Sequence, residues 1–314
     1  MRSSSRDEKG RRDLAKLNQK DQFFMREITL QELLEAGCHF GHQVNRRNPK
    51  ADEYIFEARS NVHIINLEKT HEGLMSASEY VKNLSKRGGS MILVGNKRQA
   101  QGIVRDEYKR AKEAGASNFY YVASRWIGGT FTNFSEVSKN FKKLHDIRAL
   151  LNSKDRAGYT KREMVLFARE LANLEALYEG IADMSGIPDA VFVIDTHLEK
   201  TAVEEARKMK VKVVGIVDTN ADPLEVDYPI PANDDAVGSI KIITEYLTDV
   251  WIEGQKEGEM QRAKEAKEKG EGESVKGEEK KAEKKDEISN TKVSGSKKKA
   301  KIEKTDTAEA GKNR

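Results

Sequence analysis

Residues 190–217, AVFVIDTHLEKTAVEEARKMKVKVVGIV, decide the fold of this chain. Two short runs in this stretch, 190–194 and 213–217, are continuously apolar, and the segment from Glu199 to Met209 between them has the spacing of an amphipathic helix. A continuous apolar run is typical of a strand buried on both faces, and a strand–helix–strand succession favours parallel pairing. The stretch therefore predicts one β–α–β unit of an α/β domain.

The same rhythm extends outward in both directions. Further apolar runs stand at 62–65, 91–94 and 119–122, and helical patterns at 67–86, 98–114 and 235–251. Nearer the N-terminus, Thr29 and Glu32 have the spacing of a helix capping box, and Gly37 marks the end of that short helix. The sequence thus predicts a doubly wound, mainly parallel five-stranded sheet with helices on both faces.

An insertion interrupts this pattern between the third and fourth predicted strands. Two series of residues alternate spacings of three and four, which is the heptad signature of packed helices. The polar link at 152–161 is short enough to turn the second helix back along the first. We therefore predict a protruding antiparallel coiled-coil hairpin at about 134–182. The two series are Phe134, Val137, Phe141, Leu144, Arg148 and Leu151, and Met164, Phe167, Leu171, Leu174, Tyr178 and Ile181.

Charge divides the chain into three parts. The whole sequence of 314 residues has a formal net charge of +4, but the polar ends at 1–27 and 253–314 carry all of the excess positive charge. These ends lack the apolar residues needed to build a core, so we predict a disordered N-terminal extension at 1–27 and a disordered charged tail at 253–314. The α/β domain is predicted at 28–252. Because this domain is slightly acidic, nucleic-acid binding has to depend on local clusters of cations.

Composition also indicates the cellular environment in which we expect the protein to function. Cys38 is the only cysteine, and no window of about eighteen apolar residues occurs. We therefore expect no intrachain disulfide, no membrane partner and a cytoplasmic location.

Nucleotide and metal sites are disfavoured by the loop sequences. The predicted strand–helix turns at 66–70, 95–99 and 195–199 lack the glycine spacing that lets backbone approach a pyrophosphate, so we expect no nucleotide and no other cofactor. Cys38, His39 and His42 offer zinc ligands, but a structural zinc site usually has a second pair, and none is visible. We therefore expect no metal.

Catalysis is the second hypothesis. Asp195, His197 and Asp218 lie near the carboxyl ends of predicted strands, where α/β enzymes place catalytic groups. However, no serine or cysteine with an adjacent base accompanies them, and Asp195 and Asp218 are predicted to cap the following turns. We expect that the protein is not an enzyme. The alternative is an enzyme that depends on a nucleotide or a sugar phosphate.

Cations, amides and one indole cluster in loop segments instead. Arginine forks match phosphate oxygens, paired glycines allow close approach of backbone, and an aromatic ring beside arginine is able to stack on a base. Several such loops at one edge of a parallel sheet would form a positive face on an acidic domain. The candidate RNA-contacting residues are His39, His42, Arg46, Arg47, Asn48, Lys50, Lys69, Lys97, Arg98, Arg125, Trp126, Thr132 and Asn133.

Several motifs, in order along the chain, resemble one known family. The sequence is similar to bacterial small-subunit ribosomal protein S-two from about Thr29 to Trp251. The segments that carry the resemblance are 29–37 (TLQELLEAG), 39–42 (HFGH), 54–70 (YIFEARSNVHIINLEKT), 94–100 (VGNKRQA), 125–130 (RWIGGT), 187–190 (IPDA), 217–223 (VDTNADP) and 230–236 (IPANDDA).

This resemblance implies a structural constituent of the small ribosomal subunit that binds rRNA near the head–body junction. It also implies contact with neighbouring small-subunit proteins and a role in initiation, in which the protein helps dock the large mRNA-binding protein of the subunit. One departure concerns the segment Asn48-Pro49-Lys50, which the family usually continues with methionine and a basic residue. Here Ala51 and Asp52 follow, and the acidic side chain weakens the case for a phosphate contact just after Lys50.

Overall fold

A parallel five-stranded sheet organises the domain. The computed structural model describes residues 28–153 and 158–263. The strands are β4 (Met91–Val94), β5 (Phe119–Val122), β6 (Ala190–Val193), β7 (Lys212–Val217) and β8 (Tyr228–Pro231). Their order is β5-β4-β6-β7-β8, and each neighbouring pair is parallel. The predicted α/β class with a mainly parallel sheet is confirmed.

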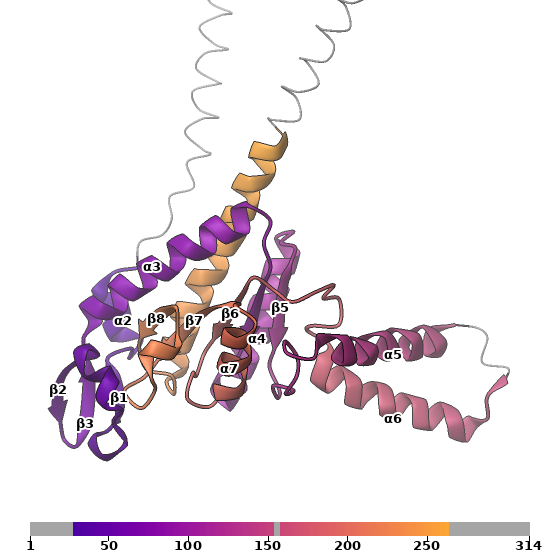
Figure 1. Cartoon of the computed structure of the whole chain (residues 1–314), viewed down its shortest axis with the longest axis horizontal. Helices are drawn as coiled ribbons and strands as arrows, with labels where there is room; N and C mark the ends of the chain where they lie inside the picture. The colour runs from indigo at the N-terminus through magenta and orange to yellow at the C-terminus, as the bar shows by residue number, and fades with distance from the viewer. Residues whose placement is uncertain (1–27, 154–157, 264–314) are drawn as a thin grey trace, which may run out of the picture. The chain divides into compact units, whose positions relative to one another are not determined.

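Helices cover both faces of this sheet, which explains why its central strands are apolar throughout. On one face, Leu93 and Phe192 pack against α3 (Leu67–Lys86), α4 (Arg98–Glu113) and a helix at 237–263. On the other face, Val94 and Val193 pack against α7 (Lys200–Lys208) and the base of the helical insertion. Alternate side chains of one strand thus enter different cores, and the strands between the two layers are fully buried (Figure 1).

The identity of the fifth strand was predicted wrongly. Residues 62–65 form β3 (Val62–Ile65) of a separate antiparallel sheet with β1 (Phe40–Gln43) and β2 (Ile55–Arg59), in the order β1-β3-β2. Ser60 and Asn61, both with positive φ, make the two-residue turn that pairs β2 locally with β3. The fifth parallel strand is β8, whose two prolines obscured it. Proline is tolerated there because β8 is an edge strand.

The helical insertion consists of α5 (Phe134–Asn152) and α6 (Lys161–Tyr178). The helices are antiparallel, because Arg148 near the end of α5 pairs with Glu175 at 2.7 Å, while Phe141, earlier in α5, packs edge-on against Tyr178 at the end of α6. The ring of Phe141 joins the core of the sheet domain, so the base of the hairpin is fixed to the domain (Figure 1). Supercoiling of the two helices remains a prediction.

Short-range signals at the ends of helices are confirmed. In α2 (Leu30–Glu35), Thr29 and Glu32 form the expected reciprocal capping box, and Gly37 follows with φ of 78°. The helix at 237–263 runs past the predicted domain boundary at 252/253. Gln255, only 5% exposed, accepts from the Ser117 N–H at 2.7 Å and donates to the Ser117 carbonyl at 2.6 Å. The domain therefore extends beyond residue 252.

The predicted disordered segment 1–27 and residues 264–314 of the predicted tail lie outside the described residues. Among the helices that the structure describes, none combines the length and the apolar character needed to span a lipid bilayer.

Candidate nucleic-acid interface

The carboxyl ends of the parallel strands meet along one edge, and the predicted RNA-contacting segments gather there. Arg125 follows β5, and Lys97 and Arg98 follow β4. Residues 46–50 reach the same edge from the small sheet, because the Asn48 N–H donates to the Thr219 carbonyl at 2.8 Å, just beyond β7. The structure thus brings together loops that lie far apart in the sequence.

Lys50 and Lys69 belong to the same edge of the sheet. Lys50 Nζ lies 2.5 Å from an oxygen of Asp222 in the loop after β7. Lys69 stands in the first turn of α3, next to Thr70, whose hydroxyl donates to the Pro231 carbonyl at the end of β8 at 2.5 Å. Cations therefore lie along the carboxyl edge of the parallel sheet from β5 to β8.

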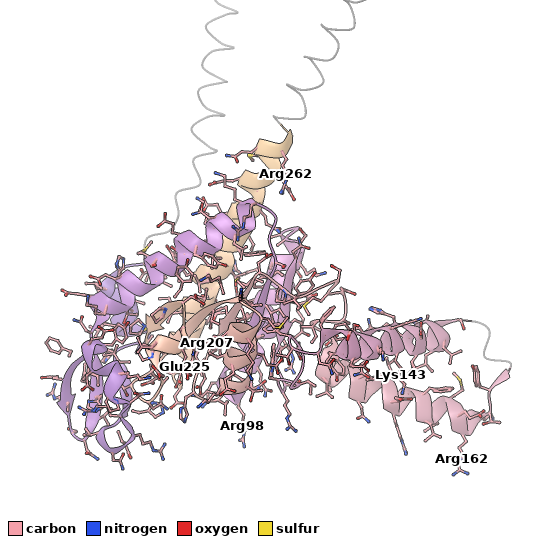
Figure 2. The ribbon with its side chains drawn as sticks, in the orientation of Figure 1. Arg98, Lys143, Arg162, Arg207, Glu225 and Arg262 are labelled. Atoms are coloured by element: carbon pink, nitrogen blue, oxygen red, sulfur yellow. The ribbon has the colours of Figure 1, made fainter. Side chains whose placement is uncertain are left out.

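Exposed arginines supply the accessible positive charge of this edge. Arg46, Arg98 and Arg125 are exposed, and none makes an ion pair with another residue in the described ranges 28–153 and 158–263. Figure 2 shows Arg98 projecting away from the ribbon. Arg47 pairs with Asp52 at 3.3 Å and Lys69 with Glu72 at 2.9 Å, in both cases at the surface. Exposed pairs of this kind are weak, so a phosphate is able to replace the carboxylate.

Lys97 differs from the sequence prediction of an exposed cation. Its side chain is only 16% exposed, and Nζ lies 2.7 Å from Asp195, 2.7 Å from Asp234 and 2.8 Å from Asp235. Burial alone would lower the pKa of Lys97, but the three carboxylates outweigh burial and raise it. An ammonium group has three protons to donate, so the hydrogen-bond donors of Lys97 are used by carboxylates of the protein itself. Asp234 and Asp235 come from a distant loop, which is why this pairing was not apparent from sequence patterns.

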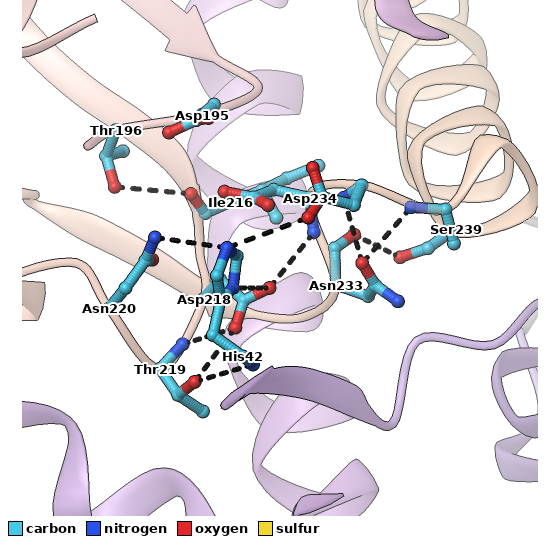
Figure 3. Close-up of polar contacts among 12 residues, drawn as sticks. His42, Asp195, Thr196, Ile216, Asp218, Thr219, Asn220, Asn233, Asp234 and Ser239 are labelled. Carbon is cyan, nitrogen blue, oxygen red and sulfur yellow. Dashed lines mark hydrogen bonds and ion pairs between the residues drawn. The ribbon is translucent and has the colours of Figure 1, made fainter. Parts of the chain in front are cut away.

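His42 belongs to the same acidic cluster (Figure 3). Its Nδ1 lies 3.1 Å from an oxygen of Asp218, and its Nε2 lies 3.6 Å from an oxygen of Asp235. The hydrogen bond with Asp218 is the main cause that raises the pKa of His42. Burial, followed by the charges of Asp195 and Asp218, raises the pKa of Asp234 to about 8. His42 therefore faces protein carboxylates inside the edge.

His39 is half-buried, with its ring centroid 3.9 Å from that of Phe40. Burial lowers the pKa of His39, so the ring is neutral at pH 7. Asn48 is also half-buried, and its side chain accepts from the Lys50 N–H at 3.0 Å. Both residues shape the loop that presents Arg46 and Arg47.

Trp126, which the sequence suggested as a stacking residue, is buried in the core. It is 6% exposed, packs edge-on against Phe131, and donates through Nε1 to Glu205 Oε1 at 3.4 Å. Glu205, from α7, also accepts from the backbone N–H groups of Gly129 at 2.7 Å and Phe131 at 3.0 Å. A buried indole is not available to a base, so the contribution of Trp126 is to anchor the loop that carries Arg125.

The same carboxylate fixes Thr132, whose backbone N–H and hydroxyl donate to Glu205 Oε2 at 3.2 and 3.3 Å. Burial would raise the pKa of Glu205, but these backbone and side-chain donors outweigh it and lower the pKa. Asn133, exposed at the start of α5, makes no side-chain cap. Sequence reasoning missed Glu205 because nothing in the α7 sequence distinguishes it from an exposed helical glutamate.

Both strand-end carboxylates accept backbone hydrogen bonds, and Asp195 caps the following turn as predicted, whereas Asp218 bonds to its immediate neighbour. Asp195 Oδ1 accepts from the Leu198 N–H at 2.8 Å, and Asp218 Oδ1 accepts from the Thr219 N–H at 2.5 Å. Both carboxylates are buried, whereas His197 is exposed. The three residues proposed for catalysis in the alternative hypothesis thus differ in environment, and two of them have structural partners.

This doubly wound domain, with arginines along one edge of its sheet and buried carboxylates beneath them, is an α/β protein that presents a charged face. Residues 33–254 match the family model described as ribosomal protein S2, and the chain belongs to that family. It is therefore a component of the small ribosomal subunit and functions in translation. Proteins of this family are generally structural rather than enzymatic.

Proposed function

We propose that the carboxyl edge of the parallel sheet binds small-subunit rRNA near the head–body junction. The observation that carries this proposal is the convergence of exposed arginines from three separate segments, represented by Arg46, Arg98 and Arg125, at one edge. Guanidinium groups bind phosphate oxygens in a bidentate manner. The spacing of these groups on a rigid sheet suits the fixed surface of a folded RNA.

The loops are held in place by the protein itself, which favours binding of a structured partner. Glu205 fixes the backbone that follows Arg125, and the Asn48 N–H ties the Arg46–Arg47 segment to the end of β7. Side chains on a rigid framework lose less conformational entropy on binding than those on a mobile loop. Of the predicted contacts, Lys97, His42 and Trp126 support the edge from within, and the exposed arginines contact rRNA.

Reversing the charge of two of these arginines tests the proposal. The double variant Arg98→Glu/Arg125→Glu is expected to reduce occupancy of the small subunit at least about tenfold and to make the remaining binding less dependent on salt concentration, because each lost phosphate contact lowers the number of counterions released on binding. Occupancy is measured by mass spectrometry of subunits purified from cells that carry both wild-type and variant chains.

The matched control is Lys109→Glu/Lys208→Glu, which makes the same change in charge. Both lysines are exposed near the C-terminal ends of α4 and α7, which lie at the amino edge of the sheet. The control variant is expected to keep normal occupancy. Equal loss in both variants would show that general charge, rather than this edge, governs binding.

We further propose that the α5–α6 hairpin contacts neighbouring small-subunit proteins and helps dock the large mRNA-binding protein. Its cations, including Lys143 and Arg162, stand on a projection whose base packs into the core of the sheet domain (Figure 2). Replacing residues 152–161 with a short glycine–serine linker is expected to leave subunit occupancy normal and to reduce initiation on structured mRNA. Loss of occupancy together with initiation would instead assign the hairpin to rRNA binding.

A further inference from the structure

The cluster beneath the arginine edge is short of positive charge. Asp195, Asp218, Asp234 and Asp235 lie close together, and Lys97 is the ammonium group that pairs with three of them. Asp195, Asp218 and Asp234 are only 5%, 1% and 0% exposed, and Asp235 lies beside them at the surface. Buried charge of one sign is costly unless a counterion or a proton neutralises it.

One acidic oxygen in this cluster has no partner. Lys97 donates to Asp234 Oδ1 at 2.7 Å, but Asp234 Oδ2, although completely buried, accepts no hydrogen bond from the described part of the chain. A buried carboxylate oxygen without a donor is rare in folded proteins and calls for a specific explanation. Asp234 reaches this position from the loop after β8, and its free oxygen lies among the side chains drawn in Figure 3.

In the metal-free protein a proton on Nδ1 of His42 is shared with Asp218, and placing that proton on Nε2 instead leaves Nδ1 able to bind a metal. Nε2 of the ring faces the side chain of Asn220 at 3.3 Å and an oxygen of Asp235 at 3.6 Å, which are suitable acceptors for an Nε2–H once the amide of Asn220 is turned to present its unpartnered Oδ1. With the proton on Nε2, the Nδ1 lone pair points toward Asp218 Oδ2 at 3.1 Å. Two electron-rich atoms at this distance require a proton or a cation between them.

We propose that His42, Asp218 and Asp234 bind one divalent metal ion of the zinc type. One ligand atom from each residue, a ring nitrogen and two carboxylate oxygens, lies within 4.8 Å of the others, so a small rotation of the side chains brings the three atoms to the spacing that metal–ligand bonds of about 2.0–2.2 Å require. Asn220 and Asp235 act as the outer groups that orient the imidazole. The ligands come from β1, the end of β7 and the loop after β8.

The presence of an imidazole ligand favours zinc over magnesium at this site. A site with one ring nitrogen and two carboxylates favours Zn²⁺, whereas Mg²⁺ prefers oxygen ligands alone and retains several waters. The site differs from the set that the sequence suggested, Cys38, His39 and His42. Burial raises the pKa of the Cys38 thiol to about 11, which disfavours the thiolate that zinc requires.

Metal binding here would connect the two sheets of the domain. His42 lies in β1 of the antiparallel sheet, and Asp218 follows β7 of the parallel sheet. A shared ion would fix the start of the segment that carries Arg46 and Arg47 against the carboxyl edge. The site would thus support the presentation of the arginines without contacting RNA.

The test uses the purified full-length chain after treatment with a chelator. Titration with ZnCl₂ is followed by calorimetry, and titration with CoCl₂ by the visible absorption of four-coordinate cobalt. We expect one ion per chain, and we expect His42→Gln and Asp234→Asn each to weaken zinc binding at least about tenfold. Zinc should also raise the Tm of the wild-type protein, because the ion binds the folded state, and MgCl₂ at the same concentration should not.

The matched control is His39→Gln, which removes a neighbouring histidine that is not part of the cluster and should leave zinc affinity unchanged. Circular dichroism checks that each variant is folded, and His42→Gln carries the test if Asp234→Asn does not fold. Stoichiometric zinc binding that survives both cluster variants, or that is lost in His39→Gln, would overturn the assignment, as would the absence of binding. Because this experiment contains no RNA, its outcome is independent of the proposed rRNA interface.

Discussion

Replacing Lys97 with methionine is expected to destabilise the domain by about 3–5 kcal/mol, the range observed when one partner of a buried ion pair is removed. Methionine keeps most of the volume of the side chain but removes the ammonium that lies within 2.8 Å of three carboxylates. Asp195 and Asp234 would then repel each other in a buried region, and Asp235 at the surface beside them would add to the repulsion. Equilibrium unfolding in urea, followed by circular dichroism with chelator present, measures the change.

Two further variants show whether the acidic cluster is the cause. Adding Asp234→Asn to Lys97→Met removes one of the repelling charges and should restore part of the lost stability. Lys69→Met deletes an ammonium whose partner, Glu72, lies at the exposed surface, and it should cause no measurable loss. If Lys97→Met were as stable as the wild type, the cluster would not depend on Lys97 for its neutrality.

Replacing Glu205 with alanine is expected to cost about 3 kcal/mol or more, since several donors lose a charged acceptor together. The backbone N–H groups of Gly129 and Phe131 and the indole of Trp126 all donate to this carboxylate, and Phe131 and Trp126 are buried. Unfolding in urea gives the loss of stability. Glu205→Gln should have a smaller effect, because the amide keeps one acceptor oxygen.

The sign of the pH dependence follows from the lowered pKa of Glu205. A carboxyl group with a lowered pKa in the folded state stabilises the protein above its unfolded pKa, and this contribution is lost as the pH falls through the folded pKa. The stability gap between wild type and Glu205→Ala should therefore narrow below about pH 4.5. Glu204→Ala is the matched control, because Glu204 is an exposed neighbour in α7 with a 4.0 Å contact to Lys200. A gap that is constant from pH 7 to pH 3 would contradict this account.

Much of the fold was predictable because its signals are local. The spacing of apolar residues identified β4, β5, β6 and β7 and the helices between them, since a buried parallel strand has to be apolar on both faces. The prediction of the fifth strand was wrong for a local reason as well. Pro229 and Pro231 removed the strand signal from β8, and the apolar run at 62–65 belongs to a hairpin whose two-residue turn was not recognised.

The position of the candidate interface was predictable from the sequence, but the exposure and the partners of its side chains were not. Loops after parallel strands necessarily meet at one edge, so the sequence was sufficient to place Lys97 and Arg125 together, whereas Arg47 reaches this edge through the contact of Asn48 with Thr219. The exposure of each residue was not accessible in this way. Lys97 is occupied by carboxylates more than a hundred residues away, and Trp126 is buried by contacts with Phe131 and Glu205.

By itself, the sequence determined four of the five parallel strands and the helices between them, the edge that collects their loops, and the family to which the chain belongs, since all of these follow from local pattern. Only the tertiary structure determined which charged side chains are free at the surface and which are paired with other residues of the chain. The energy of a charged group depends on its burial and on the partners within a few ångströms, and the chain supplies those partners from distant positions only when it folds.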